Sequence, residues 1–104
     1  MKASKVVRSK RAQADFRRLY AWIAIDSGHA RAAAVLARID RSIERLALRP
    51  RIGRARKDYD GEPHAFTVAP WLIVYEILPE HSGIHVLRIL DSRRDIAALM
   101  GKKS

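Results

Sequence analysis

Two runs of apolar residues, 72–78 and 84–90, constrain the fold of this chain more than any other feature of its sequence. The runs are rich in β-branched residues, and Pro79-Glu80-His81-Ser82-Gly83 separates them, which is typical of two strands joined in a hairpin. Both alternating sets of side chains are apolar, so both faces of the predicted sheet should be covered. One face is expected to carry Ile73, Tyr75 and Ile77, and the other Leu72, Val74 and Leu78; in the second run, Ile84, Val86 and Leu90 are expected to oppose Leu87 and Ile89.

Two charged residues interrupt these apolar runs. Glu76 lies in the first run and Arg88 in the second. A charged group in such surroundings needs a partner or a function, because burying an unpaired charge is costly. The two side chains could pair across the hairpin, or Arg88 could belong to a binding surface.

The N-terminal half has the pattern of a strand followed by two helices. Lys5–Arg8 predicts a short strand, and Ser9 is a plausible N-cap for the helix that follows. Gly28 is suited to end the first helix and Pro50 to end the second. The apolar positions with helical spacing are Ala12, Phe16, Leu19, Tyr20 and Ile23, then Ala32, Leu36, Ile39, Ile43 and Leu46. The two helices should form an αα-hairpin.

The remaining elements complete a predicted α+β domain covering residues 1–104. An alanine-rich seam is expected to let the two helices approach closely: Ala30, Ala32, Ala33, Ala34 and Ala37. Residues 64–68 read as a strand that Pro70 turns into the hairpin, giving a three-stranded antiparallel meander. Ile96, Leu99 and Met100 have the spacing of a short final helix or tail, and residues 101–104 are expected to fray. Helices packed on a mostly antiparallel sheet define the α+β class.

The charge of the chain is strongly positive and unevenly distributed. The formal net charge is +10, and residues 1–57 carry 16 Lys and Arg against 4 Asp and Glu. Such a field attracts nucleic acid, a ribosome or an acidic protein partner. Part of it comes from the outer face of the second helix, which alternatively is simply a solvated surface: Arg31, Arg38, Arg41, Arg45 and Arg49.

Residues 50–62 form the one stretch with neither helix nor strand periodicity. They concentrate Arg51, Arg54, Arg56 and Lys57 in a loop that is longer than most connections. The stretch is therefore the best local candidate for contacting phosphates or an acidic partner.

Several kinds of chemistry lack support in the sequence. The chain has no cysteine, which excludes disulfides and thiolate sites and fits a reducing compartment, with the cytoplasm as the default. His81 and His85 are separated by Gly83 in a turn, so no metal site is expected, and no motif indicates a serine nucleophile, a phosphate-binding loop or a cofactor. No apolar run approaches the roughly 18 residues of a membrane span, so we expect neither export nor insertion.

RNA cleavage is the catalytic activity for which the chain offers some of the required groups. It needs positive charge beside the phosphate and a group that moves protons. The charge could come from Arg54, Arg56, Lys57, Arg88, Arg93 and Arg94. The available proton carriers are His85, Tyr75, Tyr59 and Glu76, and none has an evident partner.

The order of elements and several motifs resemble the RelE/ParE family of bacterial toxins from type II toxin-antitoxin systems. The matching segments are Val7-Arg8-Ser9 with Ala12, Asp15 and Phe16; Leu46–Pro50 with Gly53-Arg54; Ile73–Ile77; and Val86–Asp95. The resemblance spans nearly the whole chain and implies a small toxin neutralised by an antitoxin whose extended or helical segment wraps it.

Within this family, RelE-like members cut mRNA on the ribosome and ParE-like members poison DNA gyrase. The nucleases often carry a histidine or tyrosine just after the last strand, where this chain has Asp91 and Ser92. Tyr20 with Trp22, and the ending Arg94-Asp95, look more ParE-like. The resemblance therefore favours gyrase as the target, with the mRNA nuclease as the alternative and a non-toxic nucleic-acid-binding module as a third possibility.

In the favoured interpretation the protein acts through a binding surface. The expected contacts to target or antitoxin are Arg54, Arg56, Lys57, Arg88, Arg93 and Arg94, with Trp71 as an aromatic anchor unless it belongs to the core. If the chain is a nuclease, the expected catalytic groups are Arg54, Arg56, Lys57, Arg88 and Arg93. An antitoxin for so basic a chain should be acidic where it docks.

Overall fold

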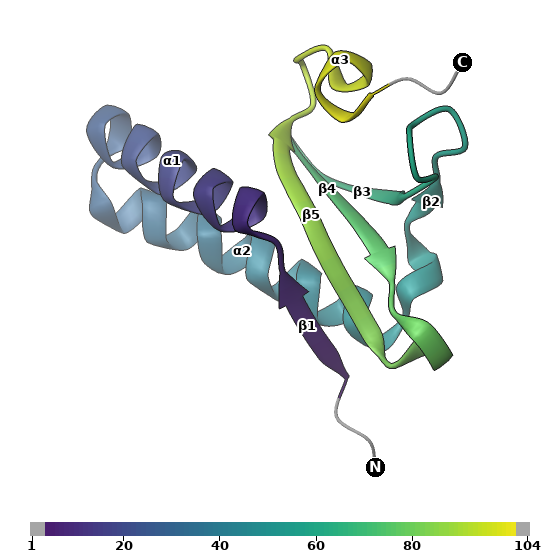
Figure 1. Ribbon diagram of the computed structural model, residues 1–104. Coiled ribbons are helices and arrows are strands. Elements are labelled where there is room, and N and C mark those ends of the chain that lie inside the picture. The colour runs from purple at the N-terminus through teal and green to yellow at the C-terminus, as the bar shows by residue number, and fades with distance from the viewer. Residues whose placement is uncertain (1–3, 102–104) are drawn as a thin grey trace.

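The computed structural model describes residues 4–101, which form a five-stranded sheet with a helical hairpin packed on one face (Figure 1). The strands are β1 Lys5–Arg8, β2 Arg54–Ala55, β3 His64–Val68, β4 Trp71–Ile77 and β5 Gly83–Asp91, in the spatial order β1-β5-β4-β3-β2. β1 runs parallel to β5, and the other neighbouring strands are antiparallel. The predicted α+β class, the helical hairpin and the β3–β4–β5 meander are confirmed.

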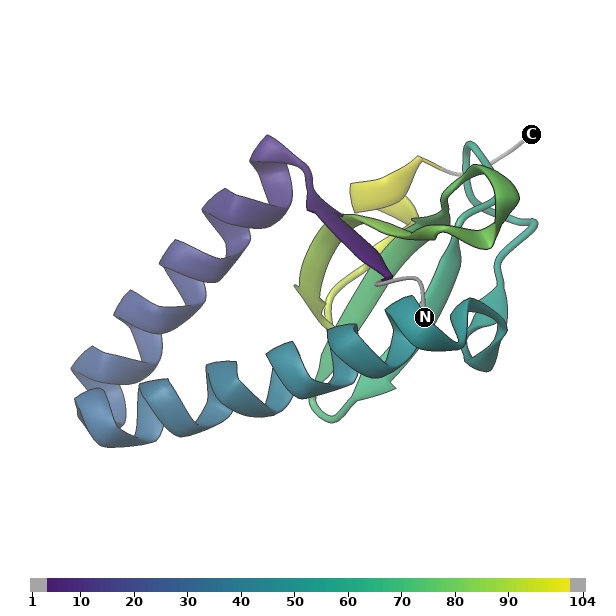
Figure 2. The same ribbon diagram turned by 90° about the horizontal axis from the view of Figure 1, so that it is seen from below.

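The two helices are joined at a single glycine. α1 spans Lys10–Ser27 and α2 spans His29–Leu48, with Gly28 between them at φ 89°, a conformation that costs glycine little. The Ser9 hydroxyl caps α1 by accepting a hydrogen bond from the Ala12 N–H at 2.9 Å. Figure 2 shows α2 running along the sheet while the closed end of the hairpin projects beyond it.

The main core lies between this hairpin and the sheet. Its fully buried helix residues include Ile39, Ile43 and Leu46, which follow the predicted apolar stripe of α2. The predicted alanine seam is largely wrong, because Ala32 is buried whereas Ala30, Ala33, Ala34 and Ala37 are exposed. The spacing of Ala30, Ala33, Ala34 and Ala37 places them together on the solvent-facing side of α2, whereas Ala32 shares the buried face with Ile39 and Ile43.

A β-bulge in β5 changes which residues of that strand share a face. Val74 lies opposite Arg88 and Tyr75 lies opposite Val86, so Leu87 is an extra residue without a partner. Beyond it the alternation is reversed: Ile89 joins Ile84 and Val86 in the main core, and Leu90 lies with Leu72 and Val74 on the opposite face. The predicted grouping of Leu90 with Ile84, and of Ile89 with Leu87, was therefore wrong.

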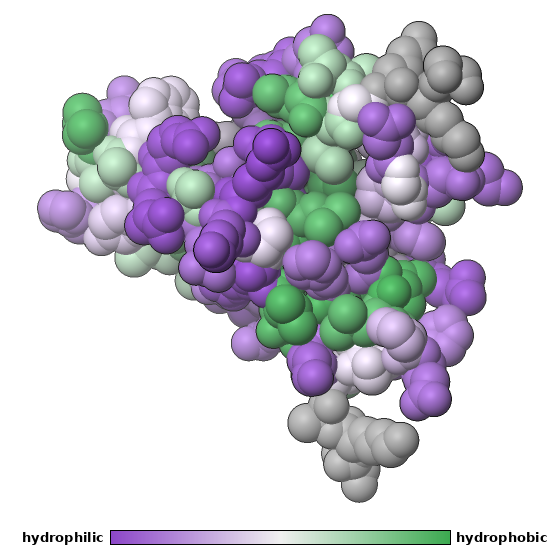
Figure 3. All heavy atoms as spheres, viewed as in Figure 1, coloured by the Kyte–Doolittle hydropathy of each residue, from purple (hydrophilic) through white to green (hydrophobic). Residues whose placement is uncertain are grey.

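The second face of the sheet is covered by the short helix α3, Ile96–Met100. Its side chains Ile96, Leu99 and Met100 pack against Ala65, Leu72, Val74 and Leu90. Figure 3 shows hydrophilic side chains over α1 and hydrophobic ones gathered over the β1–β5 region beside it. Among residues 4–101, no helix is both long and apolar enough to cross a membrane.

The basic stretch 50–62 contains more regular structure than its sequence suggested. Pro50–Ile52 form a 3₁₀ turn, and Arg54–Ala55 pair with Ala65 and His64 as the edge strand β2. The antiparallel part of the sheet therefore has four strands in the described chain, one more than predicted. The N-terminal part of this stretch is thereby fixed to the sheet.

Candidate interaction surface

Five of the seven predicted site residues fall into two groups on different elements, and Arg88 and Trp71 lie in strands outside both groups. Arg54, Arg56 and Lys57 lie on β2 and the loop after it, whereas Arg93 and Arg94 lie in the turn between β5 and α3. Arg54, Lys57 and Arg94 are exposed. Arg56 is half-buried: it donates to both carboxylate oxygens of Asp58, at 3.2 and 3.0 Å, and lies 4.2 Å from the Tyr59 ring centroid. The hydrogen bond to Asp58 raises the pKa of Arg56.

Tyr75 holds the basic stretch against the sheet. This side chain is fully buried; its hydroxyl donates to the Pro50 carbonyl at 2.6 Å and accepts from the Gly53 N–H at 3.0 Å. A Cβ on Gly53 would collide with the same hydroxyl, so the close approach requires glycine. Burial raises the pKa of Tyr75. Tyr75 is thus an anchor for the loop rather than an accessible proton carrier.

Arg88 is committed to a largely buried ion pair. Its guanidinium donates to both carboxylate oxygens of Asp15 on α1, at 2.8 and 3.0 Å, and the Ile89 N–H donates to the same carboxylate at 3.0 Å. The suggested pairing with Glu76 was wrong, because Glu76 instead lies 3.2 Å from the His85 ring nitrogen Nδ1. After the bulge Arg88 lies opposite Val74, on the face that carries α3, and its side chain meets Asp15, which is 7% exposed, at the edge of β5. Arg88 therefore joins α1 to β5.

At the end of β5, Asp91 is held in its charged form. Arg93 donates to its two carboxylate oxygens at 2.9 and 2.6 Å, and the Arg93 N–H adds a third hydrogen bond at 2.9 Å. These contacts lower the Asp91 pKa from 3.8 to about 2. Ser92 donates its hydroxyl to the Pro70 carbonyl at 2.8 Å. A carboxylate that stays ionised and bound is poorly suited to proton transfer near neutral pH.

Trp71 belongs to a groove that the sequence did not reveal. Trp71 is 8% exposed, and its ring meets the ring of Trp22 edge-on, with centroids 6.5 Å apart and an interplanar angle of 86°. Trp22 is 59% exposed. We call the hollow between the hairpin and the β3–β4 turn the tryptophan groove; its volume is about 370 Å³, and it is lined by Trp22, Ile23, Asp26, Ser27, Arg31, Ala34, Val35, Arg38, Arg41, Pro70 and Trp71.

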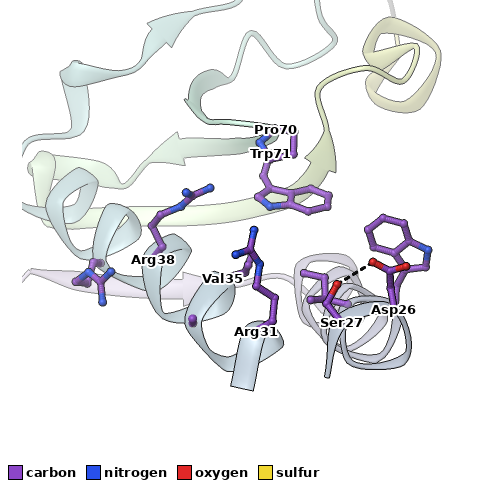
Figure 4. Close-up of a pocket in the computed structure, with 11 residues that line it drawn as sticks. Asp26, Ser27, Arg31, Val35, Arg38, Pro70 and Trp71 are labelled. Atoms are coloured by element: carbon purple, nitrogen blue, oxygen red, sulfur yellow. Dashed lines mark hydrogen bonds between the residues drawn. The ribbon is translucent and has the colours of Figure 1, made fainter. Parts of the chain in front are cut away.

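The groove is basic along its α2 side. Figure 4 shows Arg31 and Arg38 reaching from α2 toward Pro70 and Trp71. Arg38 donates to the Ala69 carbonyl at 2.6 Å, which fixes it to the β3–β4 turn. The spacing of the arginines had identified the outer face of α2, but the fold was needed to place Trp71 opposite them. The predicted anchor Trp71 is mostly buried, and Trp22 carries the exposed aromatic surface.

The architecture, a strand and an αα-hairpin followed by an antiparallel meander, is that of the RelE/ParE-type toxin fold. A solved structure described as the "Chromosomal ParDE TA system from P. aeruginosa" superposes with a TM-score of 0.72 at 18% identity, covering 86% of this chain and 96% of that chain. Toxin ParE3 of Caulobacter vibrioides is 35% identical over 100 residues, which are 96% of this chain and 98% of that protein.

The sequence places the chain more narrowly within this class. The family model for the ParE toxin of the type II toxin-antitoxin system, parDE, matches residues 6–96. The chain belongs to the ParE toxin family.

Proposed function

We propose that this toxin arrests bacterial growth by binding DNA gyrase, without catalysing a reaction. The observation that carries the proposal is the end of β5, where Asp91 is ionised and bound by Arg93. The resemblance to the RelE-like nucleases implies a histidine or tyrosine as proton carrier at this position. Arg88, one of the candidate nuclease groups, is committed to Asp15. Membership in the ParE toxin family supports gyrase as the proposed target.

The proposed contact surface comprises the accessible basic residues of the two groups. Arg54 and Lys57 present their charges on the sheet edge and the adjoining loop, and Arg94 presents its charge after β5. Arg93 is 70% exposed at its side chain even while it binds Asp91. Arg56 is half-buried and Trp71 is buried, so these two residues support the surface from beneath. Arg88, which binds Asp15, is not part of the proposed surface.

We further propose that a cognate antitoxin neutralises the toxin by covering basic surface. A segment rich in Asp and Glu would complement the +10 charge of the chain. The association rate of this pair should fall steeply with salt, because exposed charges steer the encounter and are screened over about 10 Å at 0.1 M ionic strength.

The direct test of the target uses purified chain and purified gyrase. The chain should inhibit supercoiling of relaxed plasmid or trap cleaved DNA, and an Arg93→Ala/Arg94→Ala variant should lose most of this effect. Arg17→Ala/Arg49→Ala is the matched control, because both residues are exposed helix-end or helix-surface arginines outside the two groups. Unimpaired gyrase together with cleavage of mRNA on ribosomes would replace this proposal with the nuclease alternative.

A further inference from the structure

The surface around Trp22 combines positive charge with an exposed aromatic ring. A second hollow of about 350 Å³ lies beside the tryptophan groove and is also lined by Trp22 and Trp71. The tryptophan pair therefore separates two hollows. Arg31, Arg38 and Arg41 line one side, and Arg18 and Arg94 line the other.

The acidic residues of this surface are largely neutralised within the protein. Asp15 and Asp91 line the second hollow, but Asp15 binds Arg88 and Asp91 binds Arg93. Asp26 is the one acidic residue that lines the tryptophan groove, and it accepts a hydrogen bond from the Ser27 hydroxyl at 2.8 Å. Across residues 4–101, no carboxylate lies within salt-bridge distance of Arg31, Arg41 or Arg94.

The buried Trp71 ring packs edge-on against the Trp22 ring and so supports it. Trp71 is buried and its ring is nearly perpendicular to that of Trp22, which leaves Trp22 59% exposed. A large exposed aromatic ring flanked by arginines is the arrangement by which proteins bind single-stranded nucleic acid: bases stack on the ring, and the cations follow the phosphates. An acidic peptide would satisfy the arginines, but it would not require a flat ring.

We propose that the tryptophan groove and the second hollow bind single-stranded DNA, with a base stacked on Trp22 and phosphates on the flanking arginines. The Ser27 hydroxyl in the groove donates its proton to Asp26, so it is not available as a donor to a ribose 2′-hydroxyl. The choice of DNA over RNA rests on the proposed gyrase target, which acts on DNA. The binding itself requires no gyrase and is tested without it.

The test measures fluorescence anisotropy of a labelled thymidine oligonucleotide of about 12 nucleotides over a salt series, with the purified full chain. Trp22→Ala should weaken binding by at least about fivefold with an unchanged salt slope, and Trp22→Phe should restore most of the affinity. Arg31→Ala/Arg41→Ala should reduce the slope of log K against log salt by about 1.4, which is the loss of two phosphate contacts. Arg17→Ala/Arg49→Ala, which removes the same charge outside both hollows, should leave the slope near that of the parent chain.

Three results would overturn the inference. One is an affinity that does not change in Trp22→Ala; another is a slope that changes equally in the two double-arginine variants. The third is tighter binding of a uridine oligonucleotide, or of a glutamate-rich peptide of equal charge, than of the thymidine oligonucleotide. If the chain binds DNA but leaves gyrase unimpaired, the DNA-binding inference stands and the proposed target fails. If the chain inhibits gyrase but does not bind DNA, the proposed target stands and the DNA-binding inference fails.

Discussion

Asp15 illustrates how a single side chain can organise this fold. It is 7% exposed and accepts two hydrogen bonds from Arg88 and one from the Ile89 N–H, so it satisfies both a partly buried cation and a backbone group beside the β5 bulge. Removing one member of a buried pair leaves the other charge uncompensated, which is far more costly than breaking a pair in solvent.

We therefore predict that Asp15→Asn lowers the free energy of unfolding by about 3–5 kcal/mol. The measurement is equilibrium denaturation in urea. Asp40→Asn is the control, because Asp40 pairs with Arg8 at 2.7 Å but both side chains are more than a third exposed. That change should cost about 0–1 kcal/mol. Equal losses in the two variants would contradict the structural role of Asp15.

Asp91 gives a prediction about pH. Its hydrogen bonds from Arg93 lower its pKa to about 2, below the 3.8 expected when it is unpaired, so the folded state favours the charged carboxylate. The resulting stabilisation is complete above about pH 4 and is lost as the pH falls toward 2. In Arg93→Ala, the Asp91 carboxyl should titrate closer to 3.8, as followed by carbon-13 NMR. An unchanged midpoint would show that Arg93 does not cause the shift.

At the residue scale, the sequence showed which side chains have a special role, but it did not show which residues they contact. It marked Arg88 as a charge in apolar surroundings that needs a partner, but could not identify Asp15, which lies 73 positions earlier. It placed Trp71 at a binding surface without showing that Trp22 supplies the exposed ring. Such pairings depend on how α1 crosses β5, and no local pattern encodes that.

At the scale of elements, the regular periodicity of this chain was a reliable guide. The α2 stripe and the β3 strand occur where their patterns predicted them, and Ser9 caps α1. The exceptions have physical causes. A bulge at Leu87 reverses the faces of β5 beyond it, and β2 is a two-residue strand that exists because β3 supplies its hydrogen-bond partners. Neither is visible without the neighbouring strand.

α3 is the element whose stability depends most on tertiary contacts. Five residues are too few for a helix that is stable alone, so Ile96, Leu99 and Met100 must hold it on the sheet. The Asp60 N–H also donates to the Gly101 carbonyl at 2.9 Å, which ties the basic loop to the end of α3.

We predict that Leu99→Ala frays α3 and with it the attachment of the basic loop. The Asp60 amide should exchange its hydrogen faster, because its acceptor Gly101 is no longer fixed, whereas amides of α2 should be little affected. Hydrogen exchange followed by NMR is the measurement. Ala98→Ser, at an exposed position of the same helix, is the control. Unchanged exchange at Asp60 in Leu99→Ala would show that the loop is held independently of α3.

At the scale of the whole molecule, a buried frame supports a charged exterior. The main core, the Tyr75 anchor and the Asp15–Arg88 pair fix the elements, while most arginines remain at the surface. This division fits a protein that works by presenting a surface to a macromolecular target. Membership in the ParE toxin family supports the proposed gyrase target, and the ionised Asp91 at the end of β5 supports the proposed action without catalysis.

The measurement that tests this central claim most directly is pulse-labelling of DNA and protein synthesis in bacteria within minutes of inducing the chain alone. DNA synthesis should stop first, and Arg93→Ala/Arg94→Ala should delay the arrest relative to Arg17→Ala/Arg49→Ala at equal expression. If protein synthesis stops first, the toxin acts on translation, and gyrase binding is contradicted as the cause of growth arrest.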